Sequence, residues 1–292
     1  MWQASFWDDT GRIINVASVP QRSPFRYPGG KTWLIPRIRQ WLGSLAYQPA
    51  EFVEPFAGGA IVGLTVAAEG LAEHVTLIER DEAVAAVWQT IIHDEGGGEW
   101  LAERIVSFDL TPEATRASLA AIPQTTREVA FQTILKNRVN RGGIMAPGAG
   151  MVKTGEGGRG LLSRWYPETL KRRILEIVRI RDRITFTHGD GIPALRDCAG
   201  RGDAVFFIDP PYTASGKNAG SRLYSHPDLD HELLFDIASA LAGNFLMTYD
   251  DAEEVRHLAR SHRFDMQTVA MKNTHHAKMN ELLIGRNLNW IR

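Results

Sequence analysis

The run AVFFI, residues 204–208, followed at once by Asp209, Pro210 and Pro211, constrains the fold of this chain more than any other feature. Because no polar residue interrupts it, the run predicts a buried strand of the kind found inside a parallel sheet. The prolines end the strand, since proline has no N–H to donate to a sheet ladder. An acid therefore stands at the carboxyl end of a buried strand, which is where open α/β sheets bind their ligands.

Other apolar runs alternate with helical patterns along the chain, which favours an α/β fold with a mainly parallel sheet covered by helices. Strands are expected in EFVEPFAG, HVTLIER, ITFTHGD, AVFFIDPPY and NFLMTYDD, and a hairpin in FDMQTVAMKN and NELLIGRNL. Residues 95–183 are too many for a simple connection, and they combine helical patterns with a glycine-rich middle. We expect an inserted, mainly helical subdomain at 95–183, a catalytic domain of 23–94 and 184–292, and an N-terminal extension of 1–22.

Positive charge is concentrated in one part of a nearly neutral chain. Between residues 136 and 183 twelve Lys or Arg stand against four Asp or Glu, a net charge of +8, whereas the whole chain carries −1. A basic block of this kind is typical of a surface that contacts nucleic-acid phosphates. For residues 171–183 taken alone, a solvated helix face is an equally good interpretation.

Several classes of protein are disfavoured by what the sequence lacks. There is no apolar run of about 18 residues, so no membrane-spanning helix is expected. The N-terminus lacks the pattern of a signal peptide, and a cytoplasmic location is expected. Cys198 is the single cysteine, which excludes a disulfide framework and a multi-cysteine zinc site, and we expect no bound metal.

The segment FVEPFAGG, residues 52–59, predicts a strand that turns sharply into a helix. Gly58 and Gly59 allow a close approach of ligand to backbone, and the following helix N-terminus can face an anionic group. Glu79 ends the next expected strand, where its carboxylate can accept hydrogen bonds from a ribose diol. The spacing differs from a Walker phosphate loop, which disfavours a kinase or an ATPase.

One specific reaction, attack by an exocyclic amino group of a nucleobase on an electrophile, suits the side chains and backbone of Asp209, Pro210, Pro211 and Tyr212. The exocyclic amino nitrogen of a nucleobase is a poor nucleophile, because its lone pair is conjugated with the ring. Acceptors aimed at its two N–H groups, here the Asp209 carboxylate and the Pro210 carbonyl, favour pyramidalisation and free that lone pair. Tyr212 can stack on the face of the base. These residues are the expected catalytic group.

These motifs and their order resemble the Dam-type class of DNA adenine N6-methyltransferases, including its phage and prophage members, from about residue 23 to 288. SPFRYPGGK, FVEPFAGGA, LIERDE, THGD and DPPY are similar to its motifs, and LYSHPDLDHELLFDIASALAGNFLMTYDD and NELLIGRN to its closing segments. The resemblance implies a Rossmann-like sheet and S-adenosylmethionine as the methyl donor. It also implies cofactor contacts from Tyr27, Lys31, Phe56, Gly58, Gly59, Glu79, Asp190 and Asp209, with Asp81 as the less favoured alternative to Glu79.

The resemblance further implies double-stranded DNA as the partner, a flipped target base and a DNA-reading role for the insertion. The segment NRVNRGGIMAPGAG departs from the family's Asn-Gly-x-x-Arg-x-Asn pattern. The candidate contacts are therefore chosen by side-chain chemistry. Asn137 and Asn140 are candidates for adenine edges, Arg138 and Arg141 for phosphate or guanine, and Lys153 and Arg164 are further nucleic-acid contacts.

Three alternatives stay open at this point: methylation of cytosine N4, methylation of RNA adenine, and a non-catalytic DNA-binding relative. The insertion ahead of DPPY favours DNA adenine, and so does Asp in place of Ser in that tetrapeptide. The intact Lys31, glycine turn and Glu79 argue against a decayed enzyme. A cognate restriction endonuclease is a candidate partner, and the oligomeric state is left open.

Overall fold

The computed structural model describes residues 19–26, 29–145, 149–211, 229–272 and 278–291. Seven strands form one sheet in the order β3-β2-β1-β4-β5-β7-β6. Their bounds are β1 Glu51–Glu54, β2 His74–Glu79, β3 Ile184–His188, β4 Ala204–Ile208, β5 Asn244–Asp250, β6 Asp265–Lys272 and β7 Lys278–Gly285. The first five strands pair in parallel, whereas β7 runs antiparallel to both β5 and β6.

The apolar run of β4 is buried on both faces because successive side chains of a strand point to opposite sides. Val205 and Phe207 belong to a hydrophobic cluster on one face, and Phe206 and Ile208 to a second cluster on the other. All four side chains are completely buried. Strand β4 lies between β1 and β5, so its carboxyl end opens at the middle of the sheet.

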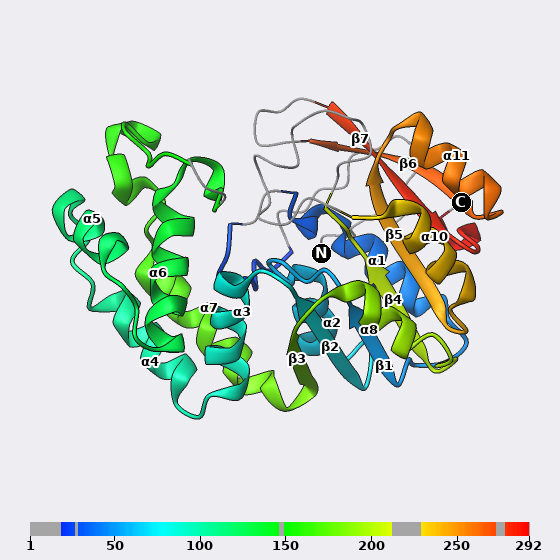
Figure 1. Ribbon diagram of the computed structural model, residues 1–292, viewed down its shortest axis with the longest axis horizontal. Coiled ribbons are helices and arrows are strands. Elements are labelled where there is room, and N and C mark those ends of the chain that lie inside the picture. Colours follow the sequence, from blue (N-terminus) through cyan, green and yellow to red (C-terminus); the bar gives the residue numbers. More distant parts are fainter. Residues whose placement is uncertain (1–18, 27–28, 146–148, 212–228, 273–277, 292) are drawn as a thin grey trace, which may run out of the picture.

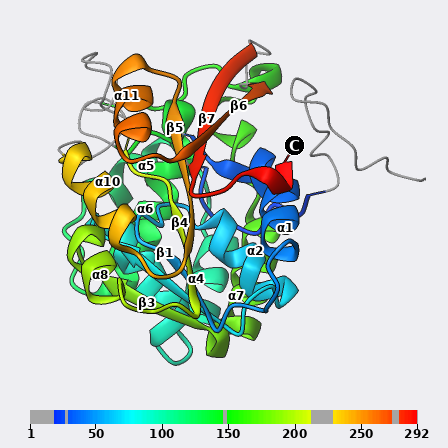
Figure 2. The same cartoon turned by 90° about the vertical axis from the view of Figure 1, so that its right-hand side faces the viewer.

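Helices cover both faces of the sheet. Figure 2 shows α8 (Gly191–Asp197), α10 (His231–Ala240) and α11 (Glu253–Ser261) on one side, and α1 (Ile35–Gly43) and α2 (Ile61–Glu69) on the other. The first group supplies Leu195, Leu234 and Val255 to one hydrophobic cluster, and α1 and α2 supply Ile38 and Leu64 to the other. This two-sided arrangement is why the parallel strands are so apolar.

A second group of helices lies beside the β3 edge of the sheet (Figure 1). It contains α4 (Gly97–Val106), α5 (Pro112–Ala120), α6 (Thr126–Val139) and α7 (Pro167–Ile180), which follow α3 (Glu82–Trp88) and the π-helix η2 (Gln89–His93). Helix α6 packs on α3, and α7 packs on α4. Their buried residues, including Leu101, Ile134 and Ile174, join the same hydrophobic cluster as β1 and β2.

The expected fold class is confirmed. The strand order, with one antiparallel strand inserted near the edge of a parallel sheet, is the Rossmann-like architecture that the resemblance implied. Each segment expected to form a strand contains one, and the expected hairpin is β6–β7. The division into three domain segments stays a prediction. Within the described ranges, no helix combines the length and the apolarity needed to cross a membrane.

Candidate active site

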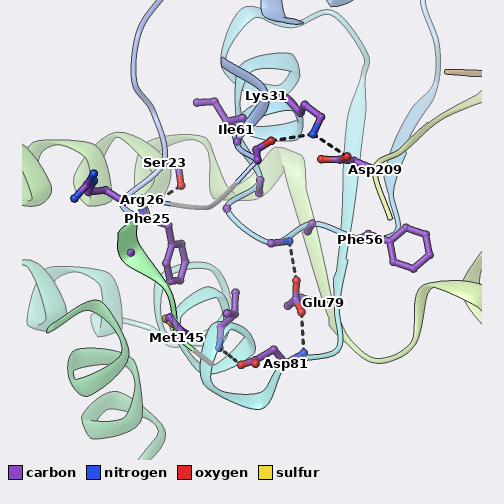
Figure 3. A pocket seen from close by; sticks show the side chains of 18 of the residues that line it. Ser23, Phe25, Arg26, Lys31, Phe56, Ile61, Glu79, Asp81, Met145 and Asp209 are labelled. Carbon is purple, nitrogen blue, oxygen red and sulfur yellow. Dashed lines mark hydrogen bonds and ion pairs between the residues drawn. The ribbon is translucent and has the colours of Figure 1, made fainter. Parts of the chain in front are cut away.

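A cavity of about 730 Å³ lies at the carboxyl ends of the parallel strands. It is lined by residues that follow β1, β2, β3 and β4, together with residues of the N-terminal segment and of the helical group. Figure 3 shows Lys31 and Asp209 in the upper part of the view, Glu79 below them, and Phe25 and Arg26 to the left. The carboxyl ends of parallel strands share one edge, so strand-end residues far apart in the sequence meet there.

The glycine turn after β1 is held in position by the second strand and by α3. The Ala57 N–H donates to the Ile78 carbonyl at 2.9 Å, and the Trp88 indole N–H donates to the Gly58 carbonyl at 3.0 Å. Gly58 has a φ of 47°, in the left-handed region that glycine adopts at little cost. The turn thereby keeps its backbone against the cavity, which Gly58 and Gly59 both line.

Glu79 is buried at the end of β2 and joins two loops. One carboxylate oxygen accepts the Gly58 N–H at 2.7 Å, and the other accepts the Asp81 N–H at 2.7 Å (Figure 3). Burial raises its pKa to about 7, because desolvation disfavours the charged form more than the two backbone donors favour it. The carboxylate that was predicted to face a ribose thus titrates near neutral pH.

Asp81 and Asp190 both begin helices beside this cavity. The Asp81 carboxylate accepts the N–H groups of Ala83 and Val84 as the N-cap of α3, so its role in the fold is accounted for. Asp190 caps α8 by accepting the Ile192 N–H at 2.9 Å. Both line the cavity, and Asp190 also lies 3.5 Å from an Arg80 nitrogen.

Lys31 connects the N-terminal segment to the end of β4. Its ammonium nitrogen lies 3.0 Å from Asp209 Oδ1 and 3.3 Å from Glu281 Oε1, and it donates to the Gly29 carbonyl at 2.8 Å. The Thr248 hydroxyl donates to the same Asp209 oxygen at 2.7 Å. Two donors on one oxygen fix the orientation of the Asp209 carboxylate, while about a fifth of that side chain stays exposed to the cavity.

Three polar residues of this region were absent from the sequence-based site. Glu54 ends β1 and accepts the Gly63 N–H at 2.8 Å, and its complete burial raises its pKa well above the ordinary value. Glu281 lies on β7 and Thr248 on β5. The acid at the end of the strand in FVEPFAGG could have indicated Glu54. Nothing local in the sequence marks the other two, which reach the site through sheet pairing.

We call Lys31, Glu54, Glu79, Asp209 and Glu281 the acidic end of the cavity. It contains four carboxyl groups and one cation, and all except Asp209 are at most 8% exposed. Asp250, at the end of the adjacent strand β5, is half-buried, and desolvation raises its pKa. Burial thus favours the neutral form of Glu54, Glu79 and Asp250, while Asp209 and Glu281 both lie beside the single cation Lys31.

The helical group holds the segment that leads to Lys31. Asn137 accepts the Arg26 N–H at 2.8 Å and donates to the carbonyls of Arg26 (3.0 Å) and Gly143 (2.9 Å). Gly143 has a φ of 75°, and a Cβ there would lie 2.3 Å from the Arg26 carbonyl oxygen. Arg138 donates to the Pro24 carbonyl, and Arg173 donates to the Ser23 carbonyl at 3.0 Å. We call these contacts the backbone clamp.

The clamp contradicts the expectation that Asn137 and Asn140 read adenine edges. Asn137 is completely buried and Asn140 is 2% exposed. The Asn140 amide donates to the Ile144 carbonyl at 2.8 Å, so both amides satisfy backbone groups. A buried backbone carbonyl or N–H needs a partner, and an asparagine amide offers both a donor and an acceptor.

The remaining predicted residues occupy different environments. Arg141 and Lys153 are exposed, and Arg164 is half-buried and lines the cavity. Phe56 and Pro211 line the cavity, and Pro210 is buried beside them. Tyr27 and Tyr212 lie outside the described residues. Among the described residues, no group of three or more His, Cys, Asp or Glu is placed to hold a metal ion.

Comparison with known proteins gives one match to a family model, over part of the chain. Residues 27–110 match the family model of the D12 class N6 adenine-specific DNA methyltransferases. The match contains Lys31, the glycine turn and Glu79, and it confirms the resemblance to the Dam-type class over this part of the chain. No curated protein matches the sequence.

Two methyltransferases of known structure are similar to this chain at low sequence identity. The rRNA methyltransferase aviRa from Streptomyces viridochromogenes has a TM-score of 0.42 and 10% identity, over 94% of this chain and 94% of that chain. Precorrin-6y C5,15-methyltransferase from Geobacter metallireducens has a TM-score of 0.35 and 9% identity, over 84% of this chain and 82% of that one. The family match and the Rossmann-like sheet together support methyl transfer as the class of activity, with S-adenosylmethionine as the donor that this class uses.

Proposed function

We propose that this protein transfers a methyl group from S-adenosylmethionine to N6 of adenine in double-stranded DNA. The observation that carries the proposal is the position of Asp209. Its carboxylate stands at the end of the most buried strand, fixed by Lys31 and Thr248, in the same cavity as the glycine turn and Glu79. An acceptor for an amino group and a binding surface for a nucleoside cofactor thus share one cavity.

The residues of the acidic end fit this donor. When bound, S-adenosylmethionine supplies an electrophilic methyl group on a positively charged sulfur. Gly58 and Gly59 keep backbone against the cavity, and Glu79 offers carboxylate oxygens to hydroxyl donors. Asp209 and Glu281 outnumber the single cation Lys31 at this end, which favours a sulfonium cation over an anionic ligand. Tyr27, Lys31, Phe56 and Asp190 complete the proposed cofactor contacts.

Asp209 would act on the target base by accepting a hydrogen bond from the exocyclic amino group. Lys31 and Thr248 keep the carboxylate in one orientation, so little reorganisation is needed when the base enters. Pro210 and Pro211 restrict the backbone beside it, which would fix a carbonyl as the second acceptor. Tyr212 would stack on the base. The base has to leave the duplex to reach a cavity of this kind.

The direct test is incubation with S-adenosylmethionine carrying a labelled methyl group and either genomic DNA or total RNA. Nucleoside analysis and methylation-sensitive sequencing then identify the modified base and its context. We expect N6-methyladenine in DNA. Label found solely in cytosine N4 or in RNA would contradict the proposed substrate, and no transfer to any nucleic acid would contradict the activity.

The role of Asp209 is tested by Asp209→Ala with Asp203→Ala as a matched control. Asp203 is exposed at the start of β4, so the two acids flank the same strand at opposite ends. Asp209→Ala should lower the methylation rate by about 10³-fold while cofactor binding is largely retained, because it removes the acceptor for the amino group. Asp203→Ala should leave the rate unchanged. Equal rates for both variants would rule out the assigned role.

A further inference from the structure

Four arginines gather at the other end of the cavity. Arg138 comes from α6, Arg173 from α7, Arg164 from the connection between those helices and Arg26 from the N-terminal segment, and all four line the cavity that contains Asp209. Figure 3 places Arg26 and Asp209 on opposite sides of the view. We call this group the arginine pocket. Two of its members, Arg26 and Arg173, were outside the sequence-based site.

In the part of the chain that the structure describes, the most buried members of the arginine pocket lack a matching negative charge. Arg138 is 4% exposed, and within the described ranges neither Arg138 nor Arg173 forms an ion pair with a carboxylate. Arg138 donates to the Pro24 carbonyl, and Arg173 donates to the Ser23 carbonyl. The Arg138 Nε–H is buried and has no hydrogen-bond partner among the described residues.

The electrostatic consequence is visible at Arg138. Desolvation, together with the nearby charges of Arg173, Arg26 and Arg164, lowers its pKa to about 9, and desolvation is the largest cause. Burying like charges together destabilises the fold. An anion that enters the cavity beside Arg138 and Arg173 would therefore relieve this cost. Guanidinium groups pair with phosphate through two parallel hydrogen bonds, which suits a phosphate better than a single point charge.

We propose that the arginine pocket binds one backbone phosphate of the nucleic-acid strand whose target base reaches Asp209. The proposal deepens the proposed function and rests on it. A base at Asp209 and a phosphate of the same strand at Arg138 and Arg173 would occupy the two ends of one continuous cavity. The phosphate contact would thus position the strand for base entry, separately from any contacts that the exposed Arg141 and Lys153 would make outside the cavity.

The first experiment measures the affinity for duplex DNA over a series of salt concentrations, for Arg173→Gln and for Arg172→Gln. Arg172 is the neighbouring residue on α7, exposed and outside the cavity, so its substitution removes the same charge from the same helix. Arg173→Gln should weaken binding about tenfold at low salt and reduce the slope of log affinity against log salt by about 0.9. An unchanged slope and affinity would overturn the proposal.

The second experiment separates a phosphate contact from a structural effect of the substitution. Duplexes carrying a single neutral methylphosphonate at successive positions are bound to each protein. In the parent protein and in Arg172→Gln, one position near the target base should lower affinity about tenfold. In Arg173→Gln that position should cause no further loss. If the full loss persists in Arg173→Gln at every position, the arginine pocket does not bind a phosphate.

The third measurement distinguishes the phosphate from the carboxylate of the cofactor. The affinity for S-adenosylmethionine without DNA should be the same in Arg173→Gln and in the parent protein. A tenfold loss of cofactor affinity with unchanged DNA binding would assign the arginine pocket to the cofactor and overturn the proposal. The methylated base is identified separately with the parent protein, so failure of the proposed function and failure of the phosphate site give different results.

Discussion

The acidic end and the arginine pocket belong to the same cavity but are built in opposite ways. At the acidic end, Lys31 lies within 3.3 Å of both Asp209 and Glu281, so opposite charges compensate each other inside the fold. In the arginine pocket, Arg138 lies among three other arginines and donates to a backbone carbonyl. The difference indicates that ion pairs inside the fold stabilise the acidic end. For Arg138 and Arg173, in contrast, we propose that the main charged partner is a bound phosphate.

The most direct test of this difference is to remove one positive charge from the acidic end and one from the arginine pocket. Lys31→Met should lower the free energy of unfolding by about 3–5 kcal/mol, because it leaves buried carboxyl groups without their cation. Arg138→Met should lower it by about 1 kcal/mol or less, since the lost hydrogen bond to Pro24 is offset by relief of desolvation and repulsion. Chemical denaturation at constant pH measures both.

The double variant Lys31→Met/Glu281→Gln serves as the control for charge. It should recover part of the stability lost in Lys31→Met, because it also removes one of the buried carboxylates. Similar losses in the free energy of unfolding for Lys31→Met and Arg138→Met would show that charge stabilises the two ends of the cavity to the same extent.

A substitution with a smaller expected effect on stability tests whether the backbone clamp connects the arginine pocket to the acidic end. Asn137→Ala should lower the free energy of unfolding by about 3 kcal/mol, because it removes three hydrogen bonds to the backbone of Arg26 and Gly143. It should also lower the rate of methyl transfer, since the segment of Arg26 leads to Lys31. Asn140→Ala removes one bond and should cost about 1 kcal/mol. Unfolding curves and single-turnover rates would be measured together, and a normal rate in Asn137→Ala would show that the ends are independent.

The smallest expected effect concerns the pH dependence of the acidic end. Because burial raises the pKa of Glu79 to about 7, the ionised fraction rises about tenfold between pH 6 and pH 8. If the carboxylate is the form that accepts hydrogen bonds from the cofactor, cofactor affinity should rise by about the same factor over that range. Titration calorimetry of the parent protein and of Glu79→Gln measures it. The variant should lose the pH dependence, and a parent affinity that falls with pH would contradict this role.

The same pKa shift affects the folding equilibrium with the opposite sign. As the pH rises from about 4.5 to about 7, the unfolded chain releases the Glu79 proton while the folded protein keeps it. The contribution of Glu79 to the free energy of unfolding therefore falls over this window. Tighter cofactor binding and lower intrinsic stability toward neutral pH would together identify Glu79 as a group shaped for ligand binding.

The sequence by itself determined the sheet and one side of the cavity. The apolar runs with acids or glycines at their ends predicted the strands, and parallel strands bring those ends to one edge whatever the details of packing. Asp209, Glu79 and the glycine turn could therefore be assigned to one cavity from local patterns. Lys31 was added by family resemblance, and the structure brings it to Asp209.

Tertiary structure alone decided which polar side chains reach that cavity from elsewhere. Glu281 reaches Lys31 because β7 pairs with β5 in a register that sets it opposite Asp250. Arg173 reaches the cavity because α7 packs on α4. Asn137 shows most clearly what the sequence leaves undecided. The same side-chain amide can form hydrogen bonds with a base edge or with a buried backbone group. Its burial against Arg26 decides between these roles, and burial depends on contacts 111 residues apart in sequence that no local pattern records.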